Sequence, residues 1–118
     1  MSTSTSSPTI SYDDFVKVDV RSGTIVRTEV FPRAKKPAYK VWVDFGPEIG
    51  VKQSSAQITV HYKPESLVGK QVAGAINLGS RNIAGFESQF LLLGFEDENG
   101  AICLITVDPK APNGKKMC

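Results

Sequence analysis

The sequence contains few of the residues on which enzymes and metal sites usually depend. Its 118 residues include one histidine, one tryptophan and two cysteines. Histidine is the usual proton carrier near neutral pH, and a disulfide framework needs a set of cysteines that can pair. We therefore expect a chain that is not an enzyme, that has no disulfide framework, and that requires no metal or cofactor.

The chain also lacks long hydrophobic runs and an N-terminal targeting signal. No window approaches the roughly 20 apolar residues of a membrane span, and the Ser/Thr-rich N-terminus has neither a basic start nor an apolar stretch. Residues 1–9 have almost nothing to bury and are predicted to be a disordered tail, with residues 10–118 forming one domain. The scarcity of cysteine favours a reducing compartment, so we expect a cytoplasmic protein without membrane insertion.

The residues that could carry chemistry are isolated from one another along the chain. His61 lies in a predicted strand, where a solvated surface histidine is far more frequent than a catalytic base. The consecutive acids Glu96–Glu98 suit a solvated turn better than a metal site. Cys103 lies within the apolar run Ile102–Val107 and is expected in the core, and Cys118 is the last residue. Neither cysteine has a histidine or cysteine at metal-ligand spacing.

Apolar residues alternate with polar ones along most of the chain, which is typical of strands with one wet face. Strands are predicted at Val16–Val30 with an interruption at Gly23, and at Tyr39–Phe45, Val51–Tyr62, Val72–Leu78, Phe90–Leu93 and Ala101–Val107. Helical turns are predicted at Tyr12–Phe15 and Pro64–Val68, and loops at Phe31–Pro37 and Gly79–Gly85. The dipeptide Asn99-Gly100 is a hairpin signal between the last two strands.

This order of elements favours an all-β fold, a five-stranded OB-fold barrel with short helical turns. The long first strand contains Gly23, which allows the bend or bulge that a barrel corner needs. A helical turn between the third and fourth strands fits this barrel better than a sandwich.

Charge is unevenly distributed. Between residues 30 and 86 the basic side chains are Arg33, Lys35, Lys36, Lys40, Lys52, Lys63, Lys70 and Arg81, and the acidic ones are Asp44, Glu48 and Glu65. From Glu87 to Pro109 there are acids and no bases. This polarity predicts one basic surface.

Large apolar residues at polar positions have two interpretations. Trp42 falls between Lys40 and Asp44 on the polar side of its strand. It either packs under a loop or a partner subunit, or it forms the floor of a binding groove, where aromatic side chains are common. Ile83 and Phe86, in a glycine-rich loop, present the same alternatives.

Several separate motifs resemble those of a known family. The run Phe15–Ile25, followed by Pro32, is similar to the opening strand of OB-class tRNA-binding domains. The segments Lys36–Gly46, Ser54–Thr59 and Pro64–Lys70 resemble CsaA-type export-related chaperones of the same superfamily. The resemblance extends from about Ile10 to the end of the chain.

This resemblance implies a homodimer that binds unfolded precursor polypeptides and the protein export machinery. The N- and C-terminal segments would form the dimer interface, with the residues Tyr12, Phe15, Val107, Pro109 and Pro112. The peptide-binding surface would consist of Trp42, Ile83, Phe86 and Phe90.

RNA-binding relatives carry the motif E-S-x-G-M-L-L, and this chain departs from it. The chain has Glu87-Ser88-Gln89-Phe90 followed by three leucines, so a phenylalanine replaces the glycine and Leu91 replaces the methionine. A bulky ring there favours peptide over tRNA. The alternative function is structure-specific tRNA binding, for which the candidate residues are Arg33, Lys35, Lys36, Lys40, Lys52, Arg81 and Ser88.

Overall fold

A five-stranded antiparallel sheet, curled into a nearly closed OB-fold barrel, forms the body of the computed structural model, which describes residues 7–118. The strand order is β3-β2-β1-β4-β7. The bounds are β1 Val20–Val30, β2 Tyr39–Asp44, β3 Val51–Ala56, β4 Gln71–Ala75 and β7 Leu91–Leu92. The expected barrel with short helical turns is therefore confirmed.

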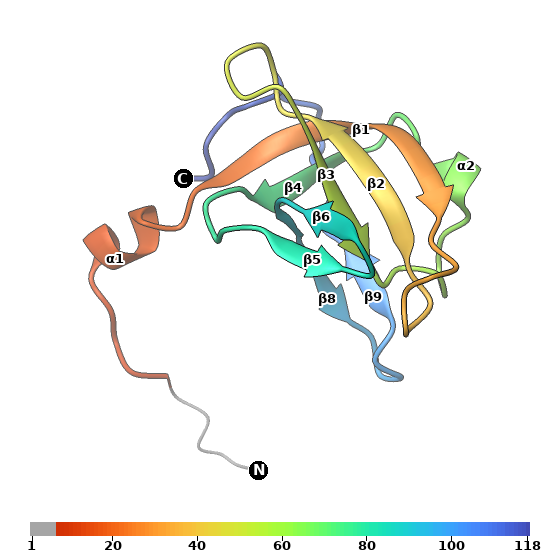
Figure 1. Cartoon of the computed structure of the whole chain (residues 1–118). Helices are drawn as coiled ribbons and strands as arrows, with labels where there is room; N and C mark the ends of the chain where they lie inside the picture. Colours follow the sequence, from red (N-terminus) through yellow and green to blue (C-terminus); the bar gives the residue numbers. More distant parts are fainter. Residues whose placement is uncertain (1–6) are drawn as a thin grey trace.

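Two hairpins and two short helices complete the fold (Figure 1). The hairpins are β5 (Arg81–Ile83) with β6 (Phe86–Ser88), and β8 (Gly94–Glu96) with β9 (Ile102–Leu104). Helix α2 (Pro64–Leu67) lies between β3 and β4 in the chain, and α1 (Tyr12–Val16) stands away from the barrel. Within residues 7–118 there is no helix that is long and apolar enough to cross a membrane.

Strand β1 bends because it belongs to both sides of the barrel. Its first half pairs with β4 and its second half with β2, and the β1–β2 register shifts between Ile25 and Arg27. Gly23 serves close packing, since a Cβ atom there would lie 2.5 Å from Val43 Cγ1 and 2.8 Å from Phe45 Cδ1. The predicted long, bent strand is confirmed from Val20 onward, whereas Val16, expected at its start, is the last residue of α1. The irregularity of the strand lies just beyond Gly23.

The core lies inside the barrel and follows the predicted alternation of β2. Tyr39, Val41, Val43 and Phe45 are all buried. Phe45 packs edge-to-face on Phe90, with ring centroids 5.1 Å apart. Alternate side chains of a strand point to the same face, so every second side chain of β2 points into the barrel interior.

Three further predictions about local structure need correction. The strand predicted to reach Tyr62 ends at Ala56, and an irregular segment of residues 57–63 follows it. The predicted loop Gly79–Gly85 contains β5 and the turn of the first hairpin. Cys103 is exposed, because its neighbours Ile102 and Leu104 turn toward the core and leave the thiol on the outer face of β9.

The tail predicted to be irregular is bonded to the barrel near its end. The amide of Ser22 donates to the carbonyl of Lys115 (3.0 Å), and the amide of Gly114 donates to the carbonyl of Ser22 (2.7 Å). Arg21 donates to the Gly114 carbonyl (2.9 Å) and to Asp19 (2.6 Å), and the hydrogen bond to Asp19 raises the pKa of Arg21. The expected tail of residues 1–9 falls mostly outside the described residues, and residues 7–9 are exposed without regular structure.

Candidate functional site

A groove of about 960 Å³ opens beside the β5–β6 hairpin. Its basic side chains are Arg33, Lys35 and Lys36, from the loop between β1 and β2, and Arg81 from β5. Glu96 is the one acid among the described residues that line it. Cations from two separate elements therefore surround a single opening, which creates a positive potential suited to a polyanion.

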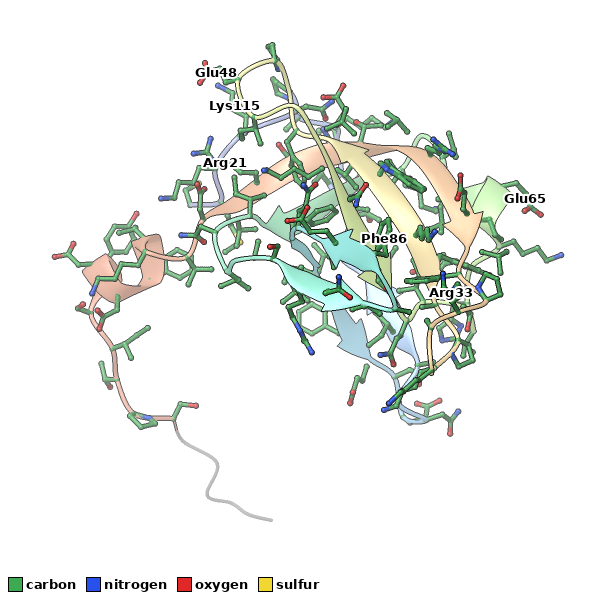
Figure 2. The ribbon with its side chains drawn as sticks, in the orientation of Figure 1. Arg21, Arg33, Glu48, Glu65, Phe86 and Lys115 are labelled. Carbon is green, nitrogen blue, oxygen red and sulfur yellow. The ribbon has the colours of Figure 1, made fainter. Side chains whose placement is uncertain are left out.

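The loop between β1 and β2 is braced, so that its cations face solvent. Phe31 is buried, and its amide donates to the carbonyl of Ala38 at 3.1 Å, which closes the base of the loop. Arg33, Lys35 and Lys36 are exposed above this base, and Figure 2 shows Arg33 in the loop. A closed loop loses little conformational entropy when a ligand binds.

Aliphatic side chains form part of the groove lining. They include side chains from the segment after β3, from β5, from β7 and from β9: Ile58, Ile83, Leu91, Leu92 and Ile102. Leu91 is 52% exposed, whereas Ile58 is buried. Apolar side chains together with a few convergent polar groups are the common form of a binding site.

An aromatic cluster lies on the outside of the sheet and consists of Phe31, Trp42 and Phe86. The Phe86 ring lies edge-on to Trp42 at 6.0 Å and to Phe31 at 5.5 Å. Arg27 lies 4.5 Å from the centre of the Trp42 ring, and Lys40 lies over Phe31 and Phe86 at 4.9 and 5.1 Å. Of the two interpretations of Trp42, the structure supports packing under a neighbouring element, here the β5–β6 hairpin.

The structure therefore separates the predicted peptide-binding residues from one another. Ile83 lines the groove, whereas neither Trp42 nor Phe86 is among its lining residues. Phe86 points toward the face of the sheet (Figure 2). Phe90 is only 4% exposed and packs in the core, so its placement on a binding surface does not hold in this structure. Gly74 makes room for it, because a Cβ atom there would lie 2.9 Å from the rings of both Phe90 and Phe45.

The predicted tRNA-binding residues also lie in more than one place. Arg33, Lys35, Lys36 and Arg81 meet at the groove, whereas Lys40 packs over the aromatic cluster and Lys52 lies on β3 outside the lining. Ser88 is 8% exposed, and its hydroxyl accepts a hydrogen bond from the amide of Ser55 at 3.1 Å. It also lies 3.2 Å from the Ser54 hydroxyl, which donates to the Phe90 carbonyl at 2.7 Å. Ser88 thus joins β6 to β3 and is not placed to contact a ligand.

We expect Ser88→Ala to lower stability without specifically weakening ligand binding. The substitution leaves the Ser55 amide without its partner, at a cost of about 1–3 kcal/mol in the free energy of unfolding. Urea denaturation of the two proteins measures the difference. Unchanged stability together with a specific loss of RNA affinity would restore Ser88 to the binding surface.

Several groove residues, chiefly Ile58, Leu92 and Ile102, are not among the candidates predicted from the sequence. Each lies in an apolar segment that was assigned to the interior of a predicted strand. They come from segments that are distant from one another in the chain. No local pattern shows that barrel closure brings them to one opening.

The predicted dimer-interface residues lie toward the two ends of the chain. Tyr12 is 69% exposed and its ring lies 6.1 Å from that of Phe15, which is half-buried. No residue of α1 is buried. Val107 is half-buried, and Pro109 and Pro112 are exposed.

Comparison with known proteins identifies a domain over nearly the whole barrel. The family model described as "Putative tRNA binding domain" matches residues 20–116. A methionine–tRNA ligase from Porphyromonas gingivalis is 38% identical over 108 residues, covering 92% of this chain and 15% of the ligase. The chain thus spans about 15% of the length of the curated relatives that it matches.

Solved structures of similar length also match. The crystal structure of chaperone CsaA from Bacillus anthracis has a TM-score of 0.87 and 40% identity, covering 94% of this chain and all (100%) of that one. The CsaA chaperone protein from Picrophilus torridus has a TM-score of 0.86 and 42% identity, covering 93% of this chain and 100% of that one.

Proposed function

The chain belongs to the tRNA-binding domain family as a CsaA-type member, and on that premise we propose that it is a non-catalytic binding protein whose groove holds the phosphate backbone of tRNA. The observation that carries this proposal is the convergence of Arg33, Lys35, Lys36 and Arg81 on one opening. A cytoplasmic location, where tRNA is found, forms part of the proposal.

The interior of the groove indicates how the RNA would be recognised. Sequence-tolerant binders of single strands stack bases on exposed aromatic rings. Among the described residues that line this groove none is aromatic, and the neighbouring aromatic rings pack on one another. Contacts to phosphates fix position and carry little sequence information. We therefore expect recognition of the shape and backbone of tRNA rather than of its base sequence.

The affinity for tRNA should fall steeply as salt is added. If four groove cations each neutralise one phosphate, the plot of log affinity against log salt has a slope of about −3, since each contact contributes roughly 0.7–0.9. Fluorescence anisotropy with labelled tRNA over a salt series measures it. Lys17→Ala removes an exposed cation that directly follows α1 and should leave the slope unchanged. A slope near zero for the unaltered protein would contradict the proposal.

A second candidate function is that of a homodimeric chaperone for unfolded, export-bound polypeptides. Two observations favour it: the aliphatic side chains in the groove lining, and the match over nearly the whole chain to two proteins named as CsaA chaperones. In this proposal Ile83, Leu91 and Ile102 contact apolar side chains of the client, and the export machinery is a partner.

An unfolded peptide should change the fluorescence of Trp42 if it enters the groove. Trp42 packs on Phe86, which shares a hairpin with Ile83 of the groove, so a movement of the hairpin alters the surroundings of the indole. This binding should depend only weakly on salt, because burial of apolar surface drives it. Ile83→Ser should weaken the response. Absence of binding by both fluorescence and calorimetry would exclude the chaperone function.

Dimerisation is proposed through the two ends of the chain. Helix α1 buries none of its residues against the barrel (Figure 1), and Tyr12 presents a large ring to solvent. A second copy that covers α1 together with Val107, Pro109 and Pro112 would bury this apolar surface.

A further inference from the structure

Three side chains that can each ligate a metal meet beside the β8–β9 hairpin. Potential ligand atoms of His61, Asp97 and Cys103 all lie within 4.8 Å of one another. His61 belongs to the irregular segment after β3, Asp97 to the turn of the hairpin, and Cys103 to β9. These residues are isolated from one another in the sequence, and folding brings them together.

Backbone contacts orient the carboxylate of this trio. Asp97 Oδ1 accepts hydrogen bonds from the amides of Asn99 at 2.8 Å and Ala101 at 2.9 Å, so the turn itself holds the side chain. The other oxygen, Oδ2, lies 2.7 Å from His61 Nε2. The backbone therefore holds Oδ1, and Oδ2 is the oxygen that faces His61. Such outer contacts are the usual support of a ligating carboxylate.

The pairing of the hairpin places the third donor on the same outer face. Cys103 lies opposite Phe95 in the β8–β9 ladder, and Phe95 is 70% exposed. Because Ile102 and Leu104 pack toward the core, the thiol of Cys103 points outward and is accessible. The thiol is therefore free to turn toward the His61–Asp97 pair.

Imidazole nitrogen, carboxylate oxygen and thiolate sulfur are together a ligand set for zinc-class ions. Calcium and magnesium prefer oxygen ligands alone, whereas zinc binds sulfur at about 2.3 Å, nitrogen at about 2.0–2.1 Å and oxygen at about 2.0–2.2 Å. Around a tetrahedral ion these lengths put neighbouring ligand atoms roughly 3.3–3.6 Å apart. The observed distances, from 2.7 Å to no more than 4.8 Å, bracket that range. Rotation of the exposed His61 and Cys103 side chains would bring the donors to it.

From this arrangement we propose that His61, Asp97 and Cys103 form a binding site for a divalent zinc-class ion, with a fourth position open to water or an external ligand. The ion fastens the segment of residues 57–63 to the β8–β9 hairpin. Both elements contribute to the wall of the groove, through Ile58 and Ile102. The site stands independently of the proposed function, because its ligands are not the groove cations.

Cobalt(II) is the direct probe, because a bound thiolate gives a sulfur-to-metal charge-transfer band and a four-coordinate ion gives strong visible bands. We expect the full-length, tag-free protein to bind one equivalent of Co²⁺ with both signals, and excess Zn²⁺ to displace it. Cys103→Ser should abolish the charge-transfer band, and His61→Gln should weaken the affinity for Zn²⁺ at least tenfold. Cys118→Ser is the matched control and should bind as the unaltered protein does.

Thermal unfolding gives a second readout that does not depend on colour. An ion that binds only the folded state raises the unfolding temperature with its concentration. Zn²⁺ should therefore raise the melting temperature of the unaltered protein and of Cys118→Ser, and should not do so for Cys103→Ser. The proposal is overturned if Co²⁺ gives no saturable spectrum, or if the spectrum survives Cys103→Ser or is lost in Cys118→Ser.

Discussion

Replacing Arg33, Lys35 and Lys36 together with alanine will weaken tRNA binding by on the order of 100-fold at physiological salt. Each cation that neutralises a phosphate releases condensed counterions, and the gain per contact at that salt is roughly fivefold. Three contacts from one loop therefore account for about two orders of magnitude. The three side chains are exposed, so their removal should leave the fold intact.

The salt slope distinguishes a lost contact from a general disturbance. In the triple variant the slope of log affinity against log salt should become shallower by the contribution of about three phosphate contacts, and the affinity should fall as well. Its unfolding midpoint should stay unchanged. Lys52→Ala provides a matched control, since Lys52 was a candidate from the sequence but lies outside the groove lining. Wild-type affinity in the triple variant would show that tRNA binds elsewhere.

Phe90→Ala will lower the free energy of unfolding by about 3–5 kcal/mol, the usual cost of truncating a buried aromatic side chain. The ring is 4% exposed and packs edge-to-face on Phe45, and Gly74 lacks the side chain that would occupy its place. Truncation leaves a cavity that this rigid barrel interior cannot fill. Chemical denaturation of the two proteins measures the loss.

Phe95→Ala is the matched control for this experiment. Phe95 is 70% exposed, so its truncation should change stability by no more than about 0.5 kcal/mol. If Phe90→Ala instead left stability unchanged and weakened peptide binding, the ring would belong to a ligand surface, as the motif comparison in the sequence predicts.

The barrel could be predicted because its strands carry local signals. The alternation from Tyr39 to Phe45 fixes which face of β2 is buried, and Pro64 begins the short helix α2 where a first-turn proline is favourable. The β5–β6 hairpin was missed because its strands are only three residues long and are flanked by glycines. Three residues contain little more than one two-residue period of alternation, which is too short to distinguish a strand from a loop.

The candidate site could be predicted only in part, because a groove depends on which segments meet. The density of cations at Arg33, Lys35 and Lys36 is visible in the sequence, whereas their meeting with Arg81 depends on the β5–β6 hairpin. Phe90 was misplaced because the run Phe90–Leu93 is apolar at every position, which leaves no period to show which side faces inward. The space that Gly74 leaves for the ring appears only in three dimensions.

Mapping the amide resonances of the protein during titration with tRNA tests the central claim most directly. If tRNA binds in the groove, the shifts will concentrate in the loop containing Arg33 and in β5 around Arg81. The resonances of residues near Arg21 and Lys115 will stay unchanged. These two residues lie beside Glu48 in a separate part of the surface (Figure 2). Shifts confined to Arg21 and Lys115, with none at the groove, would contradict the central claim.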